Sequence, residues 1–90
     1  MAACLGCGAD EVVLTSGGSE ANNLAIRGLV EARGGGHVVT SAVEHPAVTE
    51  VCAHLERRGC RITTLPVDRH GLVDPAALER AFSSKTALVS

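Results

Sequence analysis

The sequence predicts an α/β fold in which a parallel sheet of about four strands alternates with helices. Short β-branched runs alternate along the chain with longer segments whose apolar residues recur at helical spacing. The links between these segments are short and rich in Gly, Pro and Asp. Because alternating strands and helices with short links favour parallel strands and right-handed crossovers, we expect one parallel sheet.

The first half of the chain predicts two strands and two helical segments. Residues 1–7 predict the tail of a helix, and the apolar run at residues 11–15 predicts the first strand. A helix is expected over residues 18–33, and the three glycines at positions 34–36 end it. Residues 37–43 are mostly apolar and predict a buried strand. The helix is expected to bury the face that carries Ala21, Leu24, Ala25, Gly28 and Leu29.

The second half predicts two further strands, each preceded by a helix. The first of these helices covers residues 46–58, and the strand after it covers residues 61–67, whose imperfect alternation favours an edge position. Asp74 is a typical N-cap, Pro75 suits the first position of the next helix, and residues 86–90 predict the last strand. The buried faces are expected to carry Val48, Val51, Cys52 and Leu55 in one helix, and Leu78, Ala81 and Phe82 in the other.

A glycine-rich turn follows the first predicted strand. Residues 15–23 read Thr-Ser-Gly-Gly-Ser-Glu-Ala-Asn-Asn. The start of a helix offers unpaired N–H groups and a partial positive charge, which favour a phosphate. Gly17 and Gly18 allow a ligand to approach the backbone, and Ser19 adds a hydroxyl donor. The turn therefore predicts a phosphate-bearing small molecule, with an ordinary strand-to-helix turn as the alternative. The Walker and dinucleotide-binding patterns are both absent.

A histidine lies at the second strand-to-helix junction. Pro46 suits the first helical position, so His45 directly precedes the helix. If the strands are parallel, this junction lies at the same sheet edge as the glycine-rich turn, and ligands of open α/β sheets bind at that edge. The imidazole of His45 can then stack on a flat cofactor ring whose phosphate the first turn holds. The alternative is that His45 only caps its helix.

Together these two motifs resemble the aminotransferase class V family, and within it the cysteine desulfurase and selenocysteine lyase branch. That branch has a Thr-Ser-Gly-(Ala/Gly)-(Thr/Ser)-Glu-(Ser/Ala)-Asn-Asn run, which residues 15–23 match, and a Glu-His pair, which Glu44 and His45 match. The resemblance extends from about Gly8 to Ser90. It implies that residues 1–90 are a fragment of the cofactor-binding large domain, near its N-terminal part. The implied fold is a partial three-layer parallel-sheet domain of the aspartate aminotransferase type, fold type I.

The resemblance also implies a cofactor and a reaction. In the family, the residues that match Gly18 and Ser19 bind the phosphate of pyridoxal 5′-phosphate, and the histidine that matches His45 stacks on its pyridine ring. The family removes sulfur or selenium from cysteine or selenocysteine, leaving alanine, and works as a homodimer. No residue of this chain is assigned a catalytic or metal-binding role.

Several family residues lie downstream of the matched segment: the lysine that holds the cofactor, the aspartate at the pyridinium nitrogen and the cysteine that accepts sulfur. The only lysine here is Lys85, at the entry to the last strand, where we expect a solvated loop residue. The chain alone is therefore expected to be inactive. Two alternatives stay open. One is a non-catalytic short product that binds a phosphate ligand or pairs with a full-length subunit. The other is a redox or zinc module built on Cys4 and Cys7, whose Cys-x-x-Cys spacing suits both.

The remaining polar residues and cysteines carry weaker expectations. Glu44 either orients the imidazole of His45 or faces solvent, and Glu20 interacts with the helix dipole. Asn22 and Asn23 are expected to satisfy backbone groups near the turn. Cys4 and Cys7 are interpreted as incidental residues of a helix tail, and Cys52 as a small core residue. Surface positions are expected for His37, His54 and His70.

The charge and hydrophobicity of the sequence give no sign of a nucleic-acid or membrane partner. The net charge is −2, and the charged residues are spread without runs, so nothing favours nucleic acid or an anionic membrane. No stretch approaches the length of a membrane span or has the form of a secretory signal. We therefore expect the cytoplasm, or an organelle if the N-terminus is incomplete. One Phe and no Trp or Tyr leave few large residues for a core, which predicts marginal stability.

Overall fold

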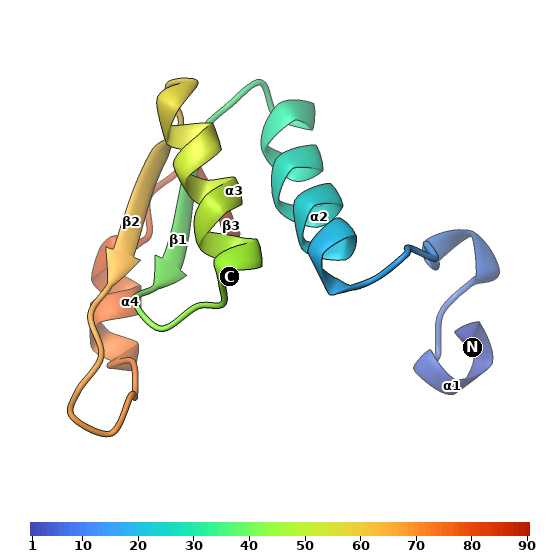
Figure 1. Ribbon diagram of the computed structural model, residues 1–90, viewed down its shortest axis with the longest axis horizontal. Coiled ribbons are helices and arrows are strands. Elements are labelled where there is room, and N and C mark those ends of the chain that lie inside the picture. Colours follow the sequence, from blue (N-terminus) through green and yellow to red (C-terminus); the bar gives the residue numbers. More distant parts are fainter.

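The computed structural model describes all residues from Met1 to Ser90. The elements follow the expected alternation after an irregular start (Figure 1). In chain order they are α1 (Ala2–Leu5), the 3₁₀ turn η1 (Ala9–Glu11), α2 (Gly18–Ala32), β1 (His37–Ser41), α3 (Pro46–Arg57), β2 (Arg61–Leu65), α4 (Pro75–Ala81) and β3 (Thr86–Val89).

The three strands form one parallel sheet in the order β2-β1-β3. The pairing of β1 with β2 is continuous from His37 opposite Arg61 to Ser41 opposite Leu65. The pairing of β1 with β3 is irregular between His37 and Val38. The edge position expected for residues 61–67 is therefore confirmed.

Helices cover both faces of this sheet. The chain moves from β1 to β2 through α3 and then back across β1 to β3 through α4. Because both crossovers are expected to be right-handed and run in opposite directions, α3 and α4 belong on opposite faces. In Figure 1, α3 lies in front of the sheet and α4 behind it, while α2 packs against α3. The result is a partial three-layer arrangement.

The core lies between the sheet and the pair α2 and α3. The face of α3 predicted from helical spacing is confirmed, since the four residues named for it are all buried. Proline at the first helical position and a side-chain N-cap define the starts of both α3 and α4. The buried cluster consists of Ile26, Val30, Val38, Val48, Val51, Cys52, Leu55 and Cys60.

The prediction of a first strand at residues 11–15 is wrong. The structure has the η1 turn followed by an irregular segment in which Val12 keeps extended dihedral angles. A strand is held by hydrogen bonds to a neighbouring strand, and residues 11–15 pair with none of the three strands. Val13 and Leu14 are 68% and 77% exposed. Three strands therefore stand where about four were expected.

The buried face predicted for α2 is also wrong. Ile26 and Val30, one turn apart, are its buried residues, whereas Leu24 and Leu29 are 52% and 43% exposed. The helix carries apolar residues on more than one side, so helical spacing alone does not select the side that meets the sheet.

The buried face predicted for α4 is confirmed only in part. Leu78 and Ala81 are half-buried. Phe82 is exposed, because the helix ends before it and Phe82 itself is extended.

His37, expected at the surface, is buried to 1% exposure and links all three strands. Its Nδ1 lies 2.9 Å from Oγ1 of Thr86 in β3, and its Nε2 lies 2.7 Å from Oγ1 of Thr63 in β2. The guanidinium of Arg61 lies 3.5 Å from Nδ1. Burial, and secondly the Arg61 charge, lower the pKa of His37. Of the other two histidines, His70 is exposed as expected, and His54 is half-buried.

We expect His37 to make the free energy of unfolding rise with pH. Because its pKa is lower in the folded state than the ordinary value of 6.5, the unfolded state binds more protons as the pH falls below that value. Stability contributed by neutral His37 is therefore present above pH 6.5 and lost below it. Urea unfolding at a series of pH values measures this slope.

The His37→Gln variant should flatten the slope, and His37→Ala should cost roughly 1–3 kcal/mol by leaving the two threonine hydroxyls without their partner. The matched control is His70→Gln, at an exposed histidine. An identical slope in wild type and His37→Gln would show that His37 is not the titrating group.

Candidate functional site

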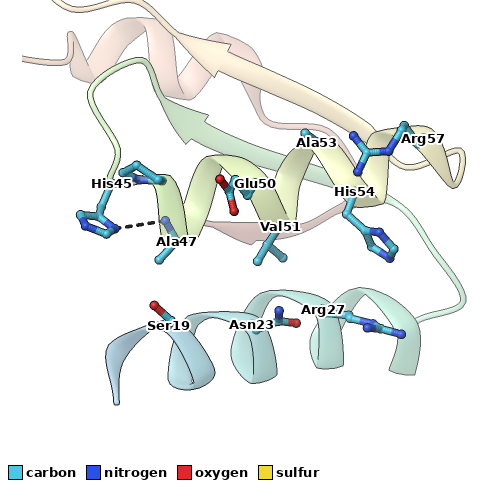
Figure 2. Close-up of a pocket in the computed structure, with 11 residues that line it drawn as sticks. Ser19, Asn23, Arg27, His45, Ala47, Glu50, Val51, Ala53, His54 and Arg57 are labelled. Carbon is cyan, nitrogen blue, oxygen red and sulfur yellow. Dashed lines mark hydrogen bonds between the residues drawn. The ribbon is translucent and has the colours of Figure 1, made fainter. Parts of the chain in front are cut away.

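A groove of about 600 Å³ runs between α2 and α3. Figure 2 shows Ser19 and His45 at one end of it, where both helices begin, and Arg27, His54 and Arg57 toward the other end. Ser19 of the glycine-rich turn and His45 thus line one groove, although the turn does not follow a strand of the sheet as expected. The full lining is Ser19, Asn23, Arg27, His45, Pro46, Ala47, Glu50, Val51, Ala53, His54 and Arg57.

The start of α2 offers free hydrogen-bond donors. Gly17 is the N-cap, and the first bond into the helix is donated by the N–H of Ala21 to the carbonyl of Gly17, at 3.0 Å. The N–H groups of Gly18, Ser19 and Glu20 have no acceptor in the chain, and the exposed Ser19 hydroxyl makes no hydrogen bond. Three backbone donors and a hydroxyl therefore converge on the positive end of a 15-residue helix.

The two glycines of this turn are not required by the fold. Gly17 has a φ of 164°, which is extended backbone, and Gly18 is helical, so other residues can adopt both conformations. A Cβ built on either glycine meets no atom within 4 Å. At Gly36, by contrast, φ is 133° and a Cβ would lie 3.0 Å from the carbonyl oxygen of Lys85. The glycines at 17 and 18 thus leave open space beside the free donors.

Two side chains hold the residues that precede α2. The Thr15 hydroxyl donates to the carbonyl of Gly17 at 3.1 Å. The N–H of Ser16 donates to Glu20 Oε2 at 3.3 Å, and the Ser16 hydroxyl donates to the same oxygen. The Ser16 hydroxyl first, and then its N–H, lower the pKa of Glu20. Glu20 lies in the first turn of α2, where we expected it to interact with the helix dipole, and it also binds Ser16.

His45 caps α3. Its Nδ1 accepts a hydrogen bond from the N–H of Ala47 at 3.1 Å. A neutral imidazole that accepts at Nδ1 carries its proton on Nε2. The residue is exposed, so its ring keeps an accessible face. His45 is therefore a helix cap, and ring stacking stays a prediction that is compatible with the cap.

Two expectations about neighbouring polar residues are wrong. The Glu44 carboxylate accepts a hydrogen bond from the Ser41 hydroxyl at 3.0 Å instead of orienting the imidazole of His45, and the residue is half-buried. Asn22 and Asn23 make no side-chain hydrogen bond to the turn, and Asn23 lines the groove. Asn22 and Asn23 are successive residues of α2 and therefore point to different sides of the helix.

The only lysine of the chain lies far from this end of the groove. Lys85 is exposed, as expected, and precedes β3, whereas His45 follows β1. Since the strands are parallel, Lys85 is at the amino-terminal edge of the sheet and His45 at the carboxyl-terminal edge.

The cysteines occupy two kinds of position. Cys4 is exposed and Cys7 half-buried, and no group of three or more His, Cys, Asp or Glu residues is placed to hold a metal ion. Cys52 and Cys60 are buried, which raises the pKa of both thiols. The expectation that Cys52 is a core residue is confirmed.

Comparison with known proteins connects this geometry to a family. The model of the aminotransferase class V family matches residues 1–90. A cysteine desulfurase IscS from Dictyoglomus turgidum is 49% identical over 92 residues, which cover 100% of this chain and 23% of the relative. The structure of SspA in complex with cysteine is similar with a TM-score of 0.88 at 40% identity, covering 98% of this chain and 26% of SspA. DndA from Streptomyces lividans gives a TM-score of 0.87 at 35% identity, with 98% and 25% covered.

The chain thus spans about a quarter of the length of these relatives. The likeness to the two solved structures confirms the predicted fold, a partial three-layer domain of fold type I. With a family model matched over its whole length, the chain belongs to the aminotransferase class V family.

Proposed function

We propose that residues 1–90 are part of the large domain of a pyridoxal 5′-phosphate-dependent cysteine desulfurase and form one wall of its cofactor site. In this proposal Gly18 and Ser19 bind the cofactor phosphate, and His45 stacks on the pyridine ring. The observation that carries the proposal is the pairing of two helix starts at one end of one groove: free N–H donors and a hydroxyl on α2, and an exposed imidazole on α3.

The donor set suits a phosphate. Three free N–H groups, the Ser19 hydroxyl and the helix dipole all favour an anion at the start of α2. The two glycines leave the adjoining space unfilled although the fold does not demand them, as expected where a ligand approaches the backbone. When bound, the cofactor supplies an electron sink, and the protein supplies binding and orientation.

His45 is suited to orient a flat ring because its own ring is fixed. The hydrogen bond from the Ala47 N–H restricts rotation of the imidazole, and the exposed face is available for stacking. The helix cap and the stacking face are therefore two uses of one residue.

The proposed substrate is cysteine, which loses its sulfur and leaves alanine. The similarity to IscS, and to SspA solved in complex with cysteine, supports this choice over selenocysteine. Because Lys85 lies at the opposite edge of the sheet, we propose that the lysine that holds the cofactor lies outside these 90 residues and that they have no activity alone. We further propose a homodimer in the cytoplasm. No helix in the structure is both long enough and apolar enough to span a bilayer.

The double substitution Gly18→Val with Ser19→Ala should weaken cofactor retention in the full-length enzyme. Valine fills the space beside the donors, and the lost serine donor to a phosphate is worth roughly 1.5–3 kcal/mol. The measurement is the cofactor content after dialysis, read from its absorption. The fold should survive, since a Cβ at Gly18 meets nothing within 4 Å. Gly28→Ala, at a similarly uncrowded glycine of α2, is the control, and undiminished cofactor content in the double variant would reject the phosphate assignment.

Two substitutions at His45 separate capping from stacking. His45→Asn keeps a good N-cap but removes the ring, so we expect unchanged thermal stability with cofactor affinity about three- to tenfold weaker, as for a lost aromatic stack. His45→Phe keeps a ring but removes the cap, which should cost about 1 kcal/mol of stability and retain more of the affinity. Alanine production, cofactor absorption and thermal unfolding measure the two effects. Full activity in His45→Asn would mean that His45 is only a cap.

A further inference from the structure

We propose that Glu20 is a positioning residue of the phosphate-binding turn, acting through Ser16. The inference rests on the function proposed above. The carboxylate of Glu20 binds Ser16 across the turn and so keeps the free N–H groups at the start of α2 in one arrangement, ready for the phosphate.

The turn needs such a restraint because its own residues do little to fix its conformation. The N-cap is Gly17, so α2 has no side-chain cap. Residues 17 and 18 are both glycine, the residue type that loses the most conformational freedom when it becomes ordered. The segment before them makes no strand pairing, and Val13 and Leu14 are exposed.

The bonds to Glu20 are the side-chain bonds that reach from this segment into the helix. The Thr15 hydroxyl bonds only to Gly17, within the turn, whereas Ser16 bonds by both its N–H and its hydroxyl to Glu20, four residues along. Glu20 occupies the third position of the helix, from which a glutamate in a capping box reaches back to the N-cap residue. Here it reaches one residue further, to Ser16. Because Glu20 bonds outside the helix and the N-cap Gly17 has no side chain, the N–H groups of Gly18 and Ser19 stay free.

The charge of Glu20 and its bonds to Ser16 have opposite effects on phosphate affinity, so two substitutions can separate them. The carboxylate carries a negative charge close to the place where a phosphate would bind, so by charge alone Glu20 weakens phosphate binding. Its bonds to Ser16 have the opposite effect, because they reduce the ordering that binding would otherwise require. A glutamine at position 20 removes the charge but keeps an oxygen that accepts from Ser16, whereas an alanine removes both.

The experiment measures the dissociation constant of inorganic phosphate by ³¹P NMR titration of the full-length protein after removal of its cofactor. We expect Glu20→Ala to bind phosphate about three- to tenfold more weakly than wild type, and Glu20→Gln to bind at least as tightly as wild type. Adding Ser16→Ala to Glu20→Ala should cause no further loss, because the two residues act as a pair.

The matched control is Glu31→Ala, which removes the same charge from the far end of α2, where Glu31 pairs with Arg27. Tighter binding in both Glu20 variants, equal weakening in both, or no change in Glu20→Ala would overturn the positioning role. If the wild-type protein does not bind phosphate, or if binding survives the double substitution Gly18→Val with Ser19→Ala, the phosphate site is rejected. The positioning role of Glu20 is then rejected with it. Binding that the Gly18 and Ser19 changes abolish but Glu20→Ala leaves unmoved rejects the positioning role alone.

Discussion

The structure depends on the pairing of β1 with a parallel strand on each side. That pairing makes β1 the centre of the sheet, and it buries Val38 and Val39 completely. Val38 belongs to the cluster against which α2 and α3 pack, while the neighbouring His37 joins β2 and β3 through two threonine hydroxyls. Because α3 leaves directly from the carboxyl end of β1, the same strand also determines where His45 lies. The position of the candidate site is thus a consequence of how the central strand is held.

The candidate site is formed by the starts of two helices, and its chemistry follows from the groups that each start leaves accessible. Helix α2 has a glycine N-cap, and its first N–H groups stay free, whereas the N–H groups in the first turn of α3 all bind His45. Helix α3 is capped by an imidazole that stays exposed. A side-chain cap on α2 would stabilise the helix but occupy donors that the proposed phosphate site needs. The restraint on the turn comes from Glu20 and Ser16, which are placed outside the row of free donors.

Most of the fold follows from local signals in the sequence. The proline and N-cap pairs at 45–46 and 74–75 mark the starts of α3 and α4, and the apolar spacing of α3 identifies its buried face. Three features depend instead on distant partners. Residues 11–15 have strand-like composition but pair with none of the three strands. Helix α2 has more than one apolar side, and His37 is buried between Thr63 and Thr86 of the two neighbouring strands. In the candidate site, the motif predicts roles for Gly18, Ser19 and His45, of which Ser19 and His45 line the groove, whereas the bond between Ser16 and Glu20 depends on the exact path of the turn.

We propose that the start of α2 and His45 together receive a phosphate-bearing ring. The first measurement would record ¹H–¹⁵N correlation spectra of the labelled protein during titration with pyridoxal 5′-phosphate and, separately, with inorganic phosphate. Both ligands are expected to shift the backbone amide signals of Gly18, Ser19 and Glu20, because these N–H groups are free to bind the phosphate. Only the ligand with a ring is expected to shift the imidazole signals of His45. Shifts confined to other parts of the chain, or equal effects of both ligands on His45, would show that α2 and His45 do not share one cofactor site.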